Sequence, residues 1–439
     1  MLWLMVGLFA VLVALGTPLA FAIGITGLFA LVQSDGPSLI RLVPMRLFSG
    51  IDMFSLMAMP FFILAGDIMN RIKITDRLVD LANAVVGGVR GALAHVNVLV
   101  SVFFVGLTGA AVADTAAIGR MMIPAMAAQG YNRAFAAAVT ASSSVIGPII
   151  PPSIIMVIYG SLMQVSIAGL FAAGLIPGIL MALSLMGYIA FRARRDDLPV
   201  ASLRGDVPPL GTALRRALIP LMMPIIILGG ILGGVFTPTE AAAVAVLYAL
   251  LVGLFLYRNL GLRDLVAMLY DMVRASGSVF IILAAASILG WVLARQGVPQ
   301  QLADFLLGIS DNPLIFLFIV TLALLVIGMF MEMTAILIIL GPILHPIAVS
   351  LGIDPLHFAI VMVVNLNIAL ATPPLGACLF VASSVGKVRF EDVAWRIMPF
   401  ILVEIAVLAA IVYIPAISLT LPRLLAATLE AAGRPAQLT

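Results

Sequence analysis

The sequence predicts an all-α protein that crosses a membrane several times. Of its 439 residues, 63% are hydrophobic and 10% are charged, whereas soluble domains average about half apolar and about a quarter charged residues. Several apolar runs reach the roughly 20 residues that a membrane-spanning helix needs, for example 217–235, 238–257 and 398–418. Such long runs indicate helices, because barrel strands give short segments of alternating hydrophobicity.

Charge, cysteine content and motifs exclude several functional classes. The net charge of +3 reflects arginines in predicted loops and does not indicate nucleic-acid binding. The single cysteine, Cys378, excludes an internal disulfide framework and a thiolate metal cluster. The sequence has no phosphate-cradling GxxxxGKS/T motif, and its three histidines lack metal-ligand spacing. We therefore expect no cofactor.

The chain contains an internal duplication. The stretch LAGDIMNRIKITDRL aligns on LGWVLARQGVPQQL without gaps when Gly66 is set on Gly290. Further along, ADTAAI resembles EMTAI, and GYNRAFAAAVTASSSVIGPIIPPS (130–153) resembles GIDPLHFAIVMVVNLNIALATPPLG (352–376). Matches that recur in the same order at a similar spacing favour two repeats over coincidence in a sequence rich in Ala, Leu and Val.

The two repeats are predicted to be inverted relative to each other. The loop 71–77 carries three basic residues and one acidic residue, whereas its counterpart 295–304 carries one of each. Because basic loops stay cytoplasmic, equivalent loops are expected on opposite sides of the membrane. The predicted organisation is a first repeat (1–191), a cytoplasmic linker (192–216), a second repeat (217–420) and a C-terminal tail (421–439).

In the first repeat, the apolar runs predict crossings, a surface segment and two interrupted elements. The runs 94–108 and 115–128 are each short for a crossing and are separated by small and polar residues, which favours a re-entrant hairpin over two full crossings. In order, we expect helices at 3–16 and 17–33, a segment along the outer face at 38–52, a helix at 53–70, an amphipathic cytoplasmic helix at 78–92, a re-entrant hairpin at about 94–128, a broken helix at about 134–163 and a helix at 166–191.

The second repeat is expected to follow the same order. Two helices at 220–236 and 238–257 match the first pair, a hairpin at about 312–350 matches the first hairpin, and a broken helix is expected at about 357–385. The fold class is therefore an all-α polytopic membrane protein with inverted repeats. It has about ten transmembrane helices plus two re-entrant hairpins and two broken helices, and both termini are periplasmic.

The first predicted break is the stretch SSSVIGPIIPPS, from Ser142 to Ser153. Its prolines remove backbone donors and clash with the preceding turn. Inside a membrane, a broken helix survives only where it lines a cavity or is buried in protein. It exposes carbonyls at one half-helix end, which suits Na⁺, and N–H groups at the other, which suits a carboxylate. A proline kink in a packed helix is the alternative.

The second break lies at the equivalent position of the other repeat. It places amides, a hydroxyl and a Pro-Pro pair together, at Asn365, Asn367, Thr372, Pro373, Pro374 and Gly376. Paired interruptions at corresponding positions of two repeats indicate a transporter binding site near the middle of the membrane. The pairing therefore favours a functional site over two packing kinks.

The tips of the two hairpins carry the other candidate residues. Asp114 and Thr115 lie near the first tip, and Glu332 and Thr334 near the second. An ionisable group at membrane depth indicates function, and acidic groups suit cation coupling better than direct anion binding. The alternative for each is a helix-capping or interhelical hydrogen-bonding role.

These motifs resemble a known family. The stretches PFFILAGDIM, GLTGAAVADTAAIGRMMIPAM, GMFMEMTAILIILGPIL and NLNIALATPPLGACLFVAS are similar to the DctM-like large membrane subunit (M subunit) of the tripartite ATP-independent periplasmic (TRAP) transporters. The resemblance extends over nearly the whole chain. It implies an elevator-type fold of the ion transporter superfamily and Na⁺-coupled import of an organic acid, such as a C4-dicarboxylate or a sugar acid, across the bacterial inner membrane. It also implies two partners, a separate small four-helix membrane subunit (Q type) and a periplasmic solute-binding protein (P type).

The resemblance also assigns sites. One Na⁺ would lie between the first tip and the first break, and a second between the second tip and the second break. The implied Na⁺ ligands are Gly109, Asp114, Thr115, Ser142, Ser144 and Gly147 in the first site, and Glu332, Thr334, Asn365, Asn367 and Thr372 in the second. The implied substrate residues, between the two tips, are Asp114, Thr115, Ser143, Pro152, Pro374 and Gly376. Many relatives have Asp where this chain has Glu332.

Two other functions are weighed against this one. An intramembrane enzyme such as a protease needs a nucleophile with a base, or paired aspartates, at one depth, and Ser143 has no histidine at matching depth in the expected trace. We therefore expect no enzymatic activity. A stand-alone Na⁺/carboxylate symporter or channel, which needs no receptor, remains the nearer alternative.

Overall fold

The computed structural model describes residues 2–72, 74–108, 110–195, 198–199, 208–309 and 311–431, and every regular element in these ranges is a helix. Seven of the helices are long and apolar enough to cross a membrane, or eight if the bent pair Ser38–Ser49 and Phe54–Arg71 counts as one crossing. The protein is therefore a multi-pass membrane protein. Fewer helices are long and apolar enough for a crossing than the ten predicted from the sequence. The reason is that several of the predicted crossings are short apolar helices of 10–17 residues.

The first half of the chain forms ten α-helices within the described ranges. They are α1 (Leu2–Ala14), α2 (Leu19–Asp35), α3 (Val43–Ser49), α4 (Ala58–Arg71), α5 (Thr75–Val86), α6 (Ala92–Thr108), α7 (Ala111–Ala128), α8 (Arg133–Ser144), α9 (Ile154–Met163) and α10 (Ile167–Arg195). The local sequence explains where several of these helices begin. The Asn132 side chain accepts hydrogen bonds from the backbone N–H groups of Ala134 and Phe135, and Ser153 caps α9 in the same way.

The second half also forms ten described α-helices. They are α11 (Leu210–Leu232), α12 (Pro238–Leu251), α13 (Leu262–Arg295), α14 (Val298–Ile309), α15 (Pro313–Gly328), α16 (Met333–Ser350), α17 (Pro355–Ala371), α18 (Ala377–Gly386), α19 (Phe390–Tyr413) and α20 (Ala416–Ala431). Thr237 and Glu240 form a reciprocal capping box at the start of α12. The boundary predicted at residue 420 falls inside α20, so the first part of the predicted tail is helical.

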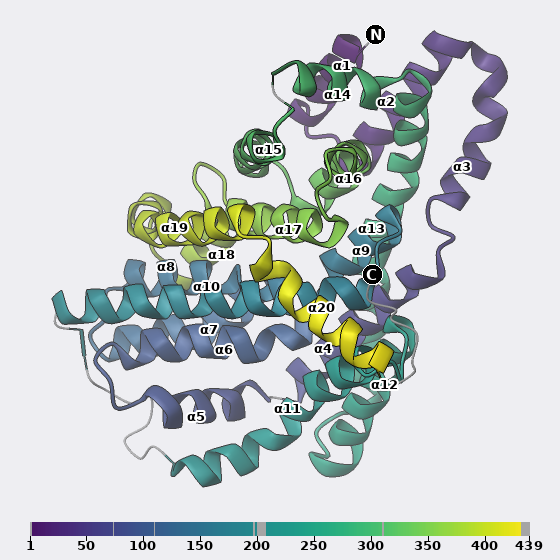
Figure 1. Cartoon of the computed structure of the whole chain (residues 1–439). Helices are drawn as coiled ribbons and strands as arrows, with labels where there is room; N and C mark the ends of the chain where they lie inside the picture. Colours follow the sequence, from purple (N-terminus) through teal and green to yellow (C-terminus); the bar gives the residue numbers. More distant parts are fainter. Residues whose placement is uncertain are drawn as a thin grey trace.

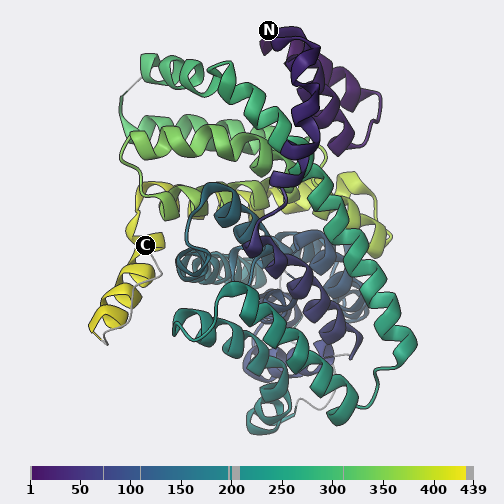
Figure 2. The same cartoon turned by 90° about the vertical axis from the view of Figure 1, so that its right-hand side faces the viewer.

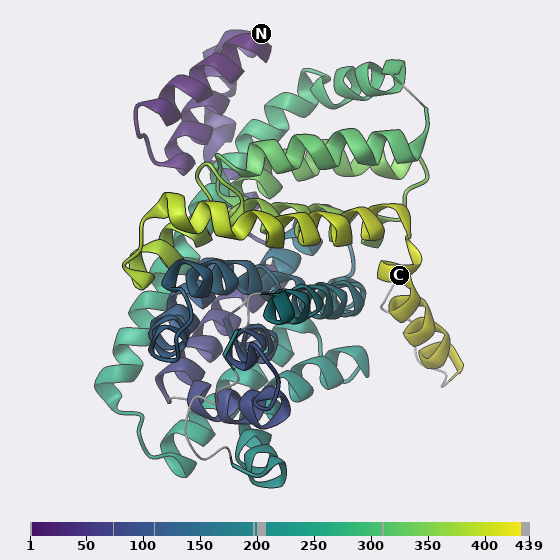
Figure 3. The same ribbon diagram turned by 90° about the vertical axis from the view of Figure 1, so that its left-hand side faces the viewer.

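The helices divide into two groups in space. In Figure 1, α6, α7, α10, α17 and α19 run across the left half of the molecule, while α13 descends on the right beside α3 and α4. Figure 2 shows α13 crossing the molecule obliquely, and Figure 3 shows α15 and α16 above the layer that contains α19. The two helices that precede the breaks, α8 and α17, form the centre, because nearly every residue of each is buried.

The packing between the two halves of the chain is crossed, which means that helices of each half pack on helices of the other. Helix α2 of the first half packs on α13 of the second, and α12 of the second packs on α4 of the first. The same exchange occurs around the breaks, where α18 packs on α7 and α8, and α9 packs on α16 and α17. Each half therefore completes its core with helices from the other.

Polar contacts reinforce one of these crossed junctions. Arg71, at the end of α4, forms an ion pair with Asp264 in the first turn of α13. The Arg77 guanidinium donates a hydrogen bond of 2.6 Å to the Tyr257 hydroxyl and lies 4.0 Å from the centre of that ring. Burial raises the pKa of Tyr257 above its usual value, and the Arg77 charge opposes this shift. The basic loop after α4 is thus attached to the chain between α12 and α13.

Candidate functional site

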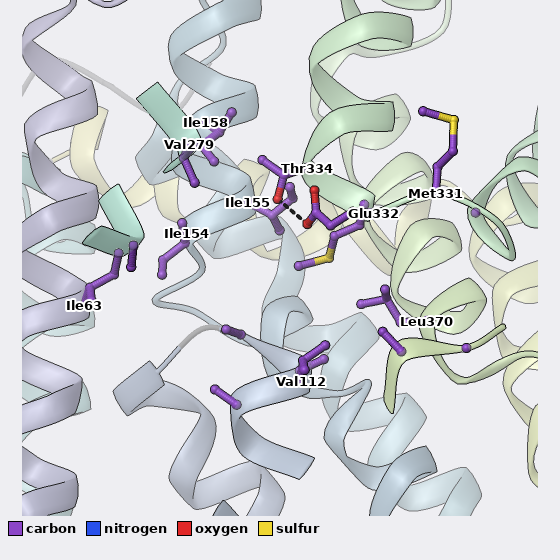
Figure 4. A pocket seen from close by; sticks show the side chains of 18 of the residues that line it. Ile63, Val112, Ile154, Ile155, Ile158, Val279, Met331, Glu332, Thr334 and Leu370 are labelled. Atoms are coloured by element: carbon purple, nitrogen blue, oxygen red, sulfur yellow. Dashed lines mark hydrogen bonds between the residues drawn. The ribbon is translucent and has the colours of Figure 1, made fainter. Parts of the chain in front are cut away.

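A cavity of about 780 Å³ lies between the two groups of helices. One wall consists of α4 and α13. The opposite wall consists of α9, Ala110 with the start of α7, the residues that join α15 to α16, and the break between α17 and α18. Figure 4 shows Val112, Ile155, Glu332 and Leu370 around this space, so both predicted hairpin tips contribute to it.

Four helices begin at the cavity. Their first residues, Ala111 of α7, Ile154 of α9, Met333 of α16 and Ala377 of α18, all line it. The first N–H groups of a helix have no partner within the helix, and the helix dipole places a partial positive charge at that end. Four such ends directed at one space form an environment that favours an anionic group.

The cavity also carries polar side chains. Glu332 and Thr334 lie at the second tip, where the Thr334 hydroxyl donates a 2.7 Å hydrogen bond to Glu332 Oε1 (Figure 4). The second carboxylate oxygen, Oε2, accepts a 3.0 Å hydrogen bond from the backbone N–H of Ala335 and so caps α16. Glu332 therefore has the capping role that the sequence left open, and it also faces the cavity.

Sequence reasoning missed the polar residues on the opposite wall. Asp67 and Asn70 reach the cavity from α4, and Asp271 reaches it from α13. A signal was present, since Asp67 interrupts the apolar run FFILAGDIM, and acids at membrane depth indicate function. Among the described lining residues there is no Lys, Arg or His. Positive potential in the cavity must therefore come from the helix ends or from bound cations.

The serines of the first break point into the protein. Ser142 Oγ donates a 2.6 Å hydrogen bond to Glu404 Oε1 of α19, and Ser144 Oγ donates a 2.7 Å bond to the Thr140 carbonyl. Ser143 Oγ donates to Asn97 Oδ1 at 3.2 Å and accepts from Ser101 Oγ at 2.9 Å. All three serines are fully buried and none lines the cavity.

Two glycines of α10 hold the first break in place. A Cβ at Gly174 would lie 2.4 Å from the Ile149 carbonyl oxygen, and a Cβ at Gly178 would lie 2.2 Å from Ile150 Cγ1. Such distances leave no room for a side chain. Gly147 and Pro152, both assigned to the site from sequence, are buried in this segment and lie outside the cavity lining.

The polar residues of the first tip are also buried. Asp114 and Thr115 lie in the first two turns of α7, fully enclosed, and Thr115 Oγ1 donates a 2.8 Å hydrogen bond to the Ala111 carbonyl. The neighbouring Ala111 and Ala113 line the cavity, whereas Asp114 and Thr115 do not. Gly109, assigned to the first Na⁺ site, lies outside the described residues.

The second break combines one cavity residue with buried amides. Gly376 lines the cavity at φ +41°, where a Cβ would lie 3.0 Å from the Thr372 carbonyl oxygen, so this position favours glycine. Asn365 donates to the Thr321 carbonyl at 2.9 Å and Asn367 to the Val363 carbonyl at 2.8 Å. The side-chain carbonyl oxygens of both asparagines are buried and accept no hydrogen bond.

The remaining candidates of the second break lie beside the cavity. Thr372 Oγ1 donates a 2.8 Å hydrogen bond to the Ile368 carbonyl, and Pro374 is exposed. Of the residues assigned from sequence, the cavity therefore brings together Glu332, Thr334 and Gly376. The polar candidates outside the lining are all buried, namely Asp114, Thr115, Ser142, Ser143, Ser144, Asn365, Asn367 and Thr372.

Comparison with known proteins places the chain among transporters. The family described as "Tripartite ATP-independent periplasmic transporter, DctM component" matches residues 6–417. YgiK of Salmonella typhimurium is 42% identical over 96% of this chain and 97% of its own length. The sialic acid TRAP transporter large permease protein SiaM of Vibrio cholerae is 39% identical over 93% of this chain and 95% of its own.

Two further matches extend the comparison. The C4-dicarboxylate TRAP transporter large permease protein DctM of Pseudomonas aeruginosa is 39% identical, over 91% of this chain and 93% of its own. Among solved structures, the YdaH transporter of Alcanivorax borkumensis superposes with a TM-score of 0.61 at 14% identity, over 92% of this chain and 91% of that one. This structural likeness concerns the fold alone.

Proposed function

Because the chain belongs to the family of DctM components, the large permease proteins of tripartite ATP-independent periplasmic (TRAP) transporters, we propose that it carries an organic acid across the bacterial inner membrane, coupled to Na⁺. Its relatives are transporter permeases, so the chain is a transporter subunit and not an enzyme.

The convergence of four helix N-termini on one cavity supports an anionic cargo. Ala111, Ile154, Met333 and Ala377 are the first residues of their helices and line the cavity, and helix N-termini favour anions. The relatives are named for sialic acid, C4-dicarboxylates and 2,3-diketo-L-gulonate, and a cavity of about 780 Å³ is large enough for acids of that range. The proposed cargo is a carboxylate of this size class.

Unpartnered oxygen atoms support Na⁺ coupling. Hard cations bind carboxylate, amide and backbone carbonyl oxygens, and Asn365 Oδ1 and Asn367 Oδ1 are buried acceptors without a donor. Because they are two residues apart on a helix, they point to different sides, and at most one of them serves a given ion. The proposed second site uses Asn365 with Glu332, Thr334 and Thr372. The first uses Asp114, Thr115, Ser142, Ser144 and the backbone around Gly109 and Gly147.

The crossed packing supports an inverted repeat and an elevator movement. The contacts of α2 with α13 and of α12 with α4 are the pair that a two-fold relation between the halves would produce. In the proposed movement, α4 and α13 belong to a static scaffold, and the tips and breaks carry the cargo past it. The cavity between the two groups is where such a cargo would be held.

The proposed partners are a small membrane subunit and a periplasmic solute-binding protein, with which members of this family work. One relative, the isethionate TRAP transporter permease protein DctMQ of Oleidesulfovibrio alaskensis, is longer, and this chain covers 65% of it. The alternative is a stand-alone symporter or channel that needs neither partner.

Reconstituted transport tests the proposal. The chain and its small subunit are placed in proteoliposomes, and uptake of labelled acids is measured with and without the receptor and an inward Na⁺ gradient. We expect uptake only when the receptor and the inward Na⁺ gradient are both present. Uptake without the receptor would favour the stand-alone alternative, and uptake indifferent to Na⁺ would remove the coupling.

A single substitution tests the second ion site. Asn365→Ala removes the unpartnered Oδ1 atom, so the Na⁺ concentration for half-maximal uptake should rise about ten-fold or more, the scale seen when support of a metal site is lost. The exposed amide substitution Gln301→Ala on α14 serves as the control. Unchanged Na⁺ activation in Asn365→Ala would show that the second break is only a kink.

A further inference from the structure

A buried carboxylate on α19 lies against the end of α8. Glu404 is fully buried near the middle of the apolar helix Phe390–Tyr413. Its Oε1 atom accepts the 2.6 Å hydrogen bond from Ser142 Oγ, and its Oε2 atom is enclosed by protein without a hydrogen-bond partner. None of the motifs that identified the two breaks includes this residue.

The surroundings of Glu404 are electrically negative. Ser142 belongs to the last turn of α8, the end at which the helix dipole places a partial negative charge. A second buried carboxylate, Asp114, belongs to α7, which packs on α8. Among the described residues, no Lys, Arg or His forms an ion pair with Glu404.

These observations leave the buried carboxyl of Glu404 without a countercharge from a protein side chain among the described residues, so a bound cation or a proton has to neutralise it. A buried carboxylate is stable only when it is paired, hydrogen-bonded or bound to a metal. Here one oxygen has a single donor and the other has none, beside a helix end of the same sign. The oxygen atoms at this place are the Glu404 carboxylate, the Ser142 hydroxyl and the carbonyls of the last turn of α8, of which those of Ser142 and Ser143 also accept backbone hydrogen bonds. All are ligand types for a hard cation.

We propose that Glu404 is a direct ligand of a Na⁺ ion bound between α8 and α19, with Ser142 Oγ and the final carbonyls of α8 completing its coordination. The inference rests on the proposed Na⁺ coupling and deepens it, because it assigns the negative charge of the first ion site to α19 rather than to the hairpin tip alone. The ion would then join α19 to the first break, and its release would loosen that contact.

Binding of Na⁺ alone tests the assignment. The chain with its small subunit is titrated in nanodiscs with NaCl against choline chloride at constant ionic strength, and thermal unfolding and tryptophan fluorescence are followed without substrate. Glu404→Gln keeps the shape and one acceptor for Ser142, removes the charge and replaces the second oxygen by an NH2 donor. The half-saturating Na⁺ concentration should rise about ten-fold or more, while the exposed Glu391→Gln, on the same helix, should leave it unchanged.

Each other outcome has a distinct meaning. A Glu404→Gln variant that is folded and titrates like the wild type overturns the inference. The same holds if this variant keeps its Na⁺ response and loses only a dependence on pH, since Glu404 would then carry a proton. If Glu404→Gln does not fold, Glu404→Asp and Ser142→Ala are titrated instead, and an unchanged Na⁺ response in both overturns it. A wild type without any Na⁺ response removes the proposed coupling itself.

Discussion

At the scale of single residues, buried polar contacts connect α6 to the first break. Ser101 donates to Ser143, Ser143 donates to Asn97, and Asn97 Nδ2 donates a 2.7 Å hydrogen bond to Thr140 Oγ1. All four side chains are buried. A buried hydrogen bond contributes modestly, but leaving one partner unsatisfied costs more. The break is therefore positioned by a network, whose members lie outside the cavity.

Ser143→Ala should disturb that network without removing the protein from the membrane. The substitution leaves Ser101 and Asn97 each with one hydrogen-bond partner fewer. This lowers the free energy of unfolding by about 1–3 kcal/mol. We expect a lower unfolding temperature, reduced uptake and weaker Na⁺ activation. Ser278→Ala, an exposed serine whose hydroxyl also bonds its own helix, is the matched control. Equal stability and uptake in the two variants would contradict a positioning role.

The sequence identified some of these residues and missed others, for a physical reason. Prolines and clustered hydroxyls mark Ser142–Ser153 by themselves, because they conflict with a membrane helix. Asn97, Ser101 and Glu404 occur singly in apolar helices. Their importance comes from which side chains they meet, and that depends on packing between distant segments.

At the scale of elements, the break between α8 and α9 depends on the helix behind it. Gly174→Ala should push α10 away from the Ile149 carbonyl, because a Cβ would lie 2.4 Å from that oxygen. Overpacking of this kind costs about 1–3 kcal/mol. The same change at Gly187, also on α10, should be neutral or slightly stabilising, because a Cβ there would have no neighbouring atom within 4 Å. Thermal unfolding compares the two variants. An equal fall in unfolding temperature in both would indicate an effect on the whole helix.

Element positions were largely predictable, since prolines, glycines and apolar run length are local signals. The predicted breaks and hairpins correspond to α8–α9, α17–α18, α6–α7 and α15–α16. The amphipathic helix predicted at 78–92 instead spans Thr75–Val86, because Gly87 and Gly88 follow it. Asp67 alone carried a sequence signal, but its meeting with Asp271 in one wall was not predictable, because it depends on how α4 and α13 pack in space.

At the scale of the whole molecule, the proposed elevator movement predicts a change in distance across the cavity. Spin labels at Val112, on the first tip, and Val279, on α13, lie on opposite walls (Figure 4). Their distance distribution should shift when Na⁺ and substrate are added, because one wall moves past the other. Labels at Ile63 and Val279, both on the proposed scaffold, should keep their distance. A shift in the second pair alone would contradict the division into scaffold and moving part.

The crossed packing has a consequence for the order in which the protein is made. When α9 leaves the ribosome, its partners α16 and α17 have not been synthesised, and α7 and α8 still lack α18. Chains are synthesised at about 5–20 residues per second, so the first half waits in the lipid with polar groups such as Asp114 and Ser142 uncovered. The contacts of α18 with α7 and α8 need synthesis up to Gly386, and those of α19 with α8 need synthesis up to Tyr413. The core around the first break is therefore completed by helices that are synthesised last.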